Sequence, residues 1–163
     1  MPRKTDARSP AAGIDLPCAC ATARRAARAV TQLYDSHLRA NNIEGTQFAL
    51  LSVLGSQGPC SQATIGHLFA LDKTTLSRNL KLLKNKGWVE AAAADDGRER
   101  RFILSAAGRK RLAEAKPAWR RAQEQLRSSM TAKEWDAMWK AFRIVTKAAR
   151  VAPRDLDSLG SRT

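Results

Sequence analysis

Cysteine and histidine are scarce in this sequence, which excludes several classes of functional site. The chain has three cysteines and two histidines, and an odd, small number of cysteines does not build a disulfide framework. His37 and His67 have no companions at metal-ligand spacing. A glycine-rich phosphate loop and a nucleophile elbow are also missing. We therefore expect no catalytic residues, no metal and no cofactor, and we do not expect an enzyme.

Long apolar runs are equally absent. No stretch of about 18 apolar residues is available to cross a membrane, and the first six residues, MPRKTD, lack the apolar core of a signal peptide. We expect a cytoplasmic protein with no membrane partner. Its length of 163 residues is typical of one folded unit.

Positive charge, by contrast, is abundant. Lysine and arginine number 29 against 15 acidic residues, a net charge of +14. Such a balance favours a polyanionic partner, because contacts to phosphates release counterions and supply affinity without regard to sequence. A protein that is merely rich in arginine, without a nucleic-acid partner, is the alternative, and the position of the charges has to decide between the two. A nonspecific architectural DNA-binding protein that exploits the same charge is a further alternative.

Apolar residues recur at helical spacing over most of the chain, which predicts a mostly α fold with one small β-hairpin. Thr131 and Glu134 form a capping box at the start of the last helix. The other predicted helices are Cys18–Ala40, Gln47–Leu54, Gln62–Phe69, Lys73–Lys86 and a long helix from Ser105 to about Ser128.

The segment Lys73–Lys86 is predicted to read DNA. Ser61 and Asp72 are N-caps of two short consecutive helices, which together form a helix-turn-helix. The second helix has five cations and no acid, and Arg78 is the candidate guanine contact because its planar fork matches O6 and N7. The predicted DNA-binding residues are Ser61, Gln62, Lys73, Thr74, Thr75, Ser77, Arg78, Lys81, Arg98 and Arg100.

A β-hairpin is predicted directly after this helix. Trp88–Glu90 is extended, Asp95–Gly97 signals a tight turn, and Arg101–Leu104 returns as a strand. The basic tip around Arg98 suits a minor groove, where negative potential is concentrated. Asp96 is expected to orient Arg98, because phosphates would repel its carboxylate. The pattern therefore predicts a wing with two strands.

These segments resemble the MarR family of bacterial transcription regulators. The resemblance is carried by Asp72–Leu80, by Leu82 and Leu83 ahead of Gly87, Trp88 and Val89, and by Asp96 and Arg98 ahead of Leu104, Ser105 and Gly108. Ser105 stands where the family usually has threonine, which preserves the capping oxygen. The resemblance covers residues 18–148 and implies a winged helix-turn-helix with N- and C-terminal dimerisation helices.

The chain then divides into five segments. We expect residues 1–15 to be a disordered basic tail, 16–44 to contain the first helix of the dimerisation region, 45–104 to be the DNA-binding domain, 105–150 to be the C-terminal dimerisation helices, and 151–163 to be a flexible tail. Trp119, Trp135, Trp139 and Phe142 are large anchors of the kind enriched at interfaces. A bacterial, nucleoid-associated homodimer would bind a pseudo-palindromic operator in double-stranded DNA, with half-sites about 34–36 Å apart.

Two kinds of effector stay open, and the role as a repressor rests on the resemblance alone. MarR-like proteins commonly respond to small phenolic or aromatic carboxylate ligands. In this sequence a cleft between the first helix, the winged domain and the long helix would present Tyr34, His37, Arg39 and Trp119.

Oxidants are the second kind of effector. Cys18 and Cys20 are candidate redox residues, because a helix N-terminus and nearby arginines lower a thiol pKa. Residues two apart on a helix point to roughly opposite faces, so a bond between these two thiols is unfavourable unless the helix begins later. Buried, inert thiols are the other interpretation, and for Cys60 a structural role is an equal alternative. A thiol-based oxidant sensor on the same scaffold therefore stands beside the ligand-controlled regulator.

Overall fold

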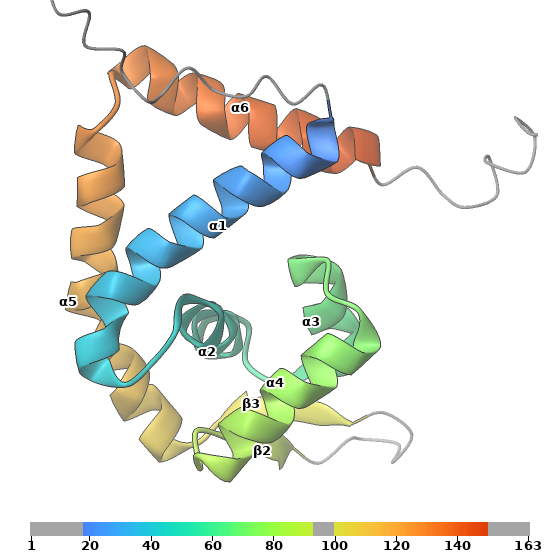
Figure 1. The fold of residues 1–163 in the computed structure, drawn as a ribbon. Helices are drawn as coiled ribbons and strands as arrows, with labels where there is room; N and C mark the ends of the chain where they lie inside the picture. Colours follow the sequence, from blue (N-terminus) through green and yellow to red (C-terminus); the bar gives the residue numbers. More distant parts are fainter. Residues whose placement is uncertain (1–17, 93–99, 150–163) are drawn as a thin grey trace, which may run out of the picture.

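The computed structural model describes residues 18–92 and 100–149. Its elements are α1 (Ala19–Leu38), the short 3-10 helix η1 (Arg39–Asn41), α2 (Gly45–Gln57), β1 (Cys60–Ser61), α3 (Gln62–Phe69), α4 (Lys73–Asn85), β2 (Val89–Ala92), β3 (Arg101–Leu104), α5 (Ala106–Ser128) and α6 (Ala132–Ala149). The predicted fold class, mostly helical with a small wing, is confirmed (Figure 1). The predicted tails and the turn at 95–97, with Asp96 and Arg98, lie outside the described residues.

The sheet has three antiparallel strands, in the order β1-β3-β2. Val89 pairs with Leu104 in the hairpin, and Cys60 pairs with Phe102 on the other side of β3. The predicted two-stranded hairpin is therefore confirmed, and β1 adds a third strand that was not predicted. A strand of two residues is too short to show an alternating pattern, so β1 leaves no signal in the sequence.

Helix α2 lies at the centre of the core. Phe48, Leu50, Leu51 and Leu54 are all buried, with exposed fractions of at most 6%, as its nearly continuous apolar sequence requires. It packs against α1, α5 and β3, and Leu76, Leu80 and Leu83 of α4 belong to the same cluster. Burial of each such side chain contributes about 1.5–3 kcal/mol to folding.

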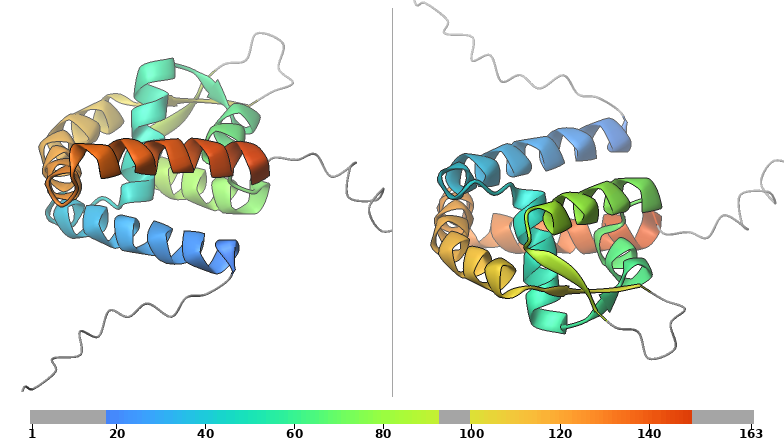
Figure 2. Two further views of the ribbon diagram at one scale, coloured as in Figure 1. Left: turned by 90° about the horizontal axis from the view of Figure 1, so that it is seen from above. Right: turned by 90° about the horizontal axis from the view of Figure 1, so that it is seen from below.

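The three longest helices form an open frame on one side of the lobe that contains α2, α3, α4 and the sheet (Figures 1 and 2). Helix α1 packs along α5. Within the described residues, α6 has no buried residue and no extensive contact with another element. Its large side chains are exposed, including Trp139 at 42% and Phe142 at 45%. No described helix is long and apolar enough to cross a membrane.

The end of α4 is held tightly against the start of α5. Gly87 has φ +69, and the N–H of Trp88 donates to the carbonyl of Leu83 at 2.9 Å, which closes α4 with a left-handed glycine. Ser105 then donates from its hydroxyl to the carbonyl of Gly87 at 2.6 Å and from its N–H to the carbonyl of Trp88 at 3.1 Å. A Cβ on Gly108 would lie 1.9 Å from the Trp88 oxygen. Only glycine permits this approach.

Candidate nucleic-acid interface

The two short helices begin at the predicted caps. The hydroxyl of Ser61 accepts a hydrogen bond from the N–H of Thr64 at 3.1 Å, and the carboxylate of Asp72 accepts one from the N–H of Thr75 at 2.9 Å. Asp72 also accepts from the Thr75 hydroxyl at 2.6 Å. The hydrogen bond from the Thr75 hydroxyl, and after it the one from the Thr75 N–H, hold the pKa of Asp72 below its usual range. The start of α4 is therefore fixed by an ionised cap.

The exposed face of α4 is polar and basic. Because Leu76, Leu80 and Leu83 are buried, the opposite side of the helix presents Arg78 and Lys81 to solvent. No ion pair involves either cation within the described part of the chain. The exposed candidates on this helix are Lys73, Thr74, Thr75, Ser77, Arg78 and Lys81. Charges that are not neutralised within the protein are free to meet an external anion.

A side-chain contact links α3 to this face. The Gln62 amide nitrogen lies 2.6 Å from the Ser77 hydroxyl and 3.5 Å from the Lys73 carbonyl. A carbonyl oxygen only accepts hydrogen bonds, so the Gln62 atom that faces the Lys73 carbonyl is the amide nitrogen. The same nitrogen faces the Ser77 hydroxyl, so Gln62 donates to both oxygens. The Ser77 oxygen therefore accepts a hydrogen bond from Gln62, and the hydroxyl hydrogen of Ser77 remains available for another acceptor.

Two of the predicted DNA contacts, Ser61 and Arg100, lie outside the α4 face. Ser61 is only 8% exposed, and its oxygen is occupied in capping α3, so its side chain does not join the exposed set. Arg100 is exposed just before β3. Arg98 and its predicted partner Asp96 belong to the segment that the structure does not describe.

An apolar cavity of about 630 Å³ lies between α2, β3 and α5. Phe48 and Trp119 stack on its floor, with ring centroids 5.8 Å apart and an interplanar angle of 16°. Arg109 lines the cavity and donates to the carbonyl of Leu104 at 2.8 Å. Lys116 at the rim is exposed and makes no ion pair within the described residues. An apolar lining with a few polar groups is typical of small-molecule sites.

Only one of the four predicted effector contacts, Trp119, lines this cavity. Tyr34 donates a hydrogen bond to Gln123, and His37 lies 2.7 Å from the Gln125 side chain. Both residues are thus engaged in packing α1 against α5. Burial raises the pKa of Tyr34.

The fourth candidate, Arg39, lines a separate polar cavity. The four residues do not line the apolar cavity together, because α1 contributes no residue to it. Phe48, Leu112 and Lys116 were missed. They come together only when α2 packs on α5, and no sequence motif marks them.

The three cysteines occupy different environments. Cys60 is 6% exposed and belongs to the core cluster. Cys18 and Cys20 are exposed free thiols, contrary to the interpretation that they are buried. Cys18 precedes α1 as its N-cap, with φ −105 and ψ 108, so the helix begins one residue later than predicted. No cluster of metal-ligating side chains occurs among residues 18–92 and 100–149.

Comparisons with known proteins agree on the kind of molecule that carries this interface. A model of the MarR family matches residues 41–99. The chain is 23% identical over 120 residues to an uncharacterised HTH-type transcriptional regulator, YwoH of Bacillus subtilis, a match that spans 74% of this chain and 88% of that protein.

Solved structures give the stronger similarity. The transcriptional regulator MosR of M. tuberculosis, solved in complex with DNA, is 32% identical, with a TM-score of 0.71 over 82% of this chain and 99% of that chain. PcaV of Streptomyces coelicolor, solved with its natural ligand, is 22% identical and shares the fold, with a TM-score of 0.74 over 85% of this chain and 99% of that chain. Taken together with the winged helix-turn-helix, these similarities establish that the chain belongs to the MarR family of transcriptional regulators.

Proposed function

We propose that this regulator is a homodimeric, sequence-specific DNA-binding repressor whose operator affinity is lowered by a small aromatic acid. The observation that carries the proposal is the exposed basic face of α4, whose cations have no acidic partner within the described residues. The DNA-bound structure of MosR supports the same use of the fold. The protein would act in the bacterial cytoplasm, on the DNA of the nucleoid.

Helix α4 is proposed to enter the major groove. Arg78 would read guanine, with Lys73, Thr74, Ser77 and Lys81 on bases or neighbouring phosphates. The wing would place Arg98 and Arg100 toward a minor groove. In this arrangement the base contacts would specify the sequence, and the phosphate contacts would supply affinity alone.

The dimer is supported by the unburied apolar face of α6. Trp139 and Phe142 are in edge-to-face contact with centroids 6.1 Å apart, yet both are more than 40% exposed. Exposed aromatic clusters of this kind mark interaction surfaces. A second copy covering α1, α5 and α6 would bury this face and fix the distance between two copies of α4.

The cavity between α2, β3 and α5 is the proposed effector site. Its stacked Phe48 and Trp119 suit a flat aromatic ring, and Lys116 at the rim suits a carboxylate. A ligand wedged there would change how the winged lobe sits on α5. Since both half-sites must be bound together for full affinity, a shift of a few ångströms in the distance between the two copies of α4 would release the operator.

Oxidant sensing is the second candidate, favoured by Cys18 and Cys20. Both thiols are exposed, and Cys18 lies in extended backbone outside the helix, so the objection based on opposite helix faces no longer applies. Loss of operator binding on peroxide treatment, abolished in a double Cys18→Ser, Cys20→Ser variant, would support this candidate. An unchanged peroxide response in that variant would eliminate it.

The main proposal is tested by selecting duplexes from a random pool with the purified dimer. The winning operator and a scrambled duplex of equal length are then titrated over a series of salt concentrations. Specific binding should favour the operator by about a thousandfold or more. Equal affinities for the two duplexes at every salt concentration would leave only a nonspecific architectural binder. A reporter placed behind the operator then distinguishes repression from activation.

A further inference from the structure

The indole of Trp88 is contacted by two cations from different parts of the fold. The Nζ of Lys86, at the end of α4, is 4.5 Å from the centre of the ring, and the guanidinium carbon of Arg111 on α5 is 5.3 Å from it. Trp88 is 8% exposed. A cation over an indole face is attracted by the ring, and more strongly when water is excluded. Helix α4, which we call the reader helix because of its proposed role, is thus connected to α5 through the Trp88 ring.

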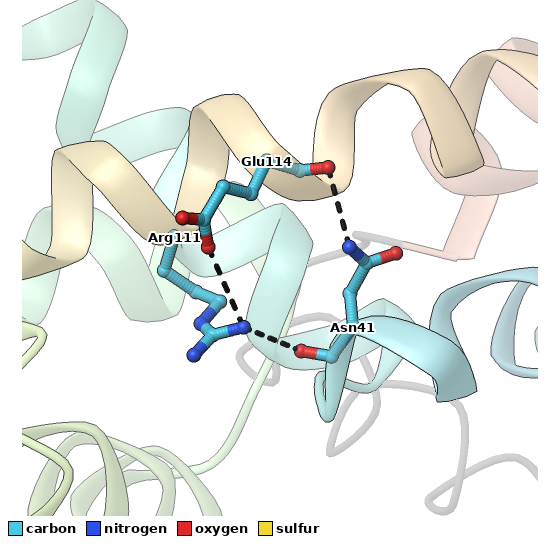
Figure 3. Close-up of polar contacts among 3 residues, drawn as sticks. All are labelled: Asn41, Arg111 and Glu114. Atoms are coloured by element: carbon cyan, nitrogen blue, oxygen red, sulfur yellow. Dashed lines mark hydrogen bonds and ion pairs between the residues drawn. The ribbon is translucent and has the colours of Figure 1, made fainter.

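Arg111 continues this connection to the end of α1. Its Nη1 donates to the backbone carbonyl of Asn41 at 2.9 Å and lies 3.6 Å from the Glu114 carboxylate. The Asn41 side chain returns a hydrogen bond to the backbone carbonyl of Glu114 at 3.2 Å. Figure 3 shows the three residues, with Asn41 reaching α5 and Arg111 reaching back to the Asn41 carbonyl.

Lys86 is fixed at the other end of the chain of contacts. Its Nζ donates to the side-chain oxygen of Gln47 at 3.1 Å, and Gln47 is only 3% exposed. A lysine at a helix end usually extends into water. Lys86 is exposed as a whole, but its ammonium contacts both the Gln47 amide and the indole, which connects the end of α4 to α2 and to Trp88.

We propose that Arg111 is a positioning residue that sets the angle between the reader helix α4 and the frame of α1 and α5. We name the contacts Gln47–Lys86–Trp88–Arg111–Asn41 the cross-brace. This inference rests on the proposed function, since the angle matters only if two copies of α4 must fit two half-sites. Arg111 is more than 30% exposed and does not belong to the basic face of α4, so its effect would reach DNA through the cross-brace.

The geometry also says why arginine is needed. One guanidinium faces the indole while its Nη1 reaches a carbonyl and a carboxylate, and its planar group has five donors in fixed directions. Lysine has one compact ammonium and no planar fork, so at position 111 it cannot turn a flat face to the indole while a separate nitrogen reaches Asn41 and Glu114. A lysine substitution therefore retains the charge and breaks the connection between Trp88 and Asn41.

The test compares Arg111→Gln with Lys110→Gln, each of which removes one positive charge from the same turn of α5. Lys110 is exposed, and within the described part of the chain it has no ion pair and no cation–π contact with the cross-brace residues. Full-length dimers are titrated against the selected operator and against a duplex with a single half-site. We expect Arg111→Gln to weaken operator binding about tenfold or more and half-site binding less than about twofold, because only the second half-site's contribution is lost. Lys110→Gln should change both equally and slightly.

Arg111→Lys and Asn41→Ala provide further variants that keep the core intact. Arg111→Lys should lose operator affinity as Arg111→Gln does, and Asn41→Ala should show a smaller loss of the same kind. Equal losses on operator and half-site, or no loss on either, would overturn the positioning role. If the wild-type dimer itself does not prefer its operator to scrambled DNA, the proposed function fails instead, and the two failures are distinguishable.

Discussion

Replacement of Gly108 by alanine probes the junction on which the reader helix depends. The new Cβ would lie 1.9 Å from the oxygen, 2.9 Å from the carbonyl carbon and 3.2 Å from the Cα of Trp88, all of them backbone atoms that cannot rotate away. To reach ordinary contact, the start of α5 has to move by more than 1 Å, as a rough estimate from steric limits. That movement would stretch both hydrogen bonds from Ser105 to the Gly87–Trp88 backbone.

The expected cost follows from these two effects. Overpacking contributes about 1–3 kcal/mol, and two weakened hydrogen bonds about 0.5–1.5 kcal/mol each, so the variant should lose roughly 2–6 kcal/mol of unfolding free energy. This is a large part of the roughly 5–15 kcal/mol that holds a domain folded. Urea unfolding at one fixed protomer concentration measures the loss, since dimerisation makes stability depend on concentration.

Gly66→Ala is the matched control, because it is the same substitution within a helix. Its Cβ would lie 3.4 Å from the nearest atom, the Leu71 oxygen, which is an ordinary contact. The control should be neutral or gain up to about 1 kcal/mol from the higher helix propensity of alanine. A Gly108→Ala protein as stable as its wild type would refute the steric reasoning.

Three further predictions concern the caps, the reader and the dimer. Because the folded-state pKa of Asp72 is lowered, its stabilisation is present above its ordinary pKa and lost as pH falls through the lower folded value; Asp72→Asn should therefore remove part of the acid sensitivity of unfolding, and an identical pH profile would contradict this. Ser77→Ala should weaken binding at one base position, because the Ser77 hydroxyl is expected to donate to N7 of a purine. In a scan with 7-deazapurines, variant and wild type should then bind equally when that N7 is missing; a uniform loss across all positions would exclude this contact. Trp139→Ser should raise the dimer dissociation constant in sedimentation experiments, with Lys140→Ser unchanged, and an intact dimer would place the interface elsewhere.

Much of the fold could be predicted because local chemistry specifies it. The caps Ser61 and Asp72 and the glycine after α4 fix where helices begin and end, and the buried leucines of α4 define its exposed face. These features depend on residues a few positions apart. The family resemblance drew on the same local motifs.

The features that could not be predicted depend on residues that are distant in sequence. The strand β1 exists because Cys60 and Ser61 pair with β3, some 40 residues later in the chain. The apolar cavity similarly arises from α2 packing on α5, and the contacts of Tyr34 with Gln123 and of His37 with Gln125 arise from α1 packing on α5, so neither can be predicted from neighbouring residues. The connection of Trp88 to Arg111 and Asn41 has no sequence signature for the same reason.

The central claim, that α4 reads bases, is tested most directly by Arg78→Ala on a panel of operators that carry every single-base substitution in one half-site. The account predicts a loss of about 1–3 kcal/mol on the wild-type operator together with loss of discrimination at one guanine position, while preferences elsewhere are retained. A uniform loss across the panel, with the wild-type pattern of preferences intact, would show that Arg78 contacts only phosphate and would contradict the claim.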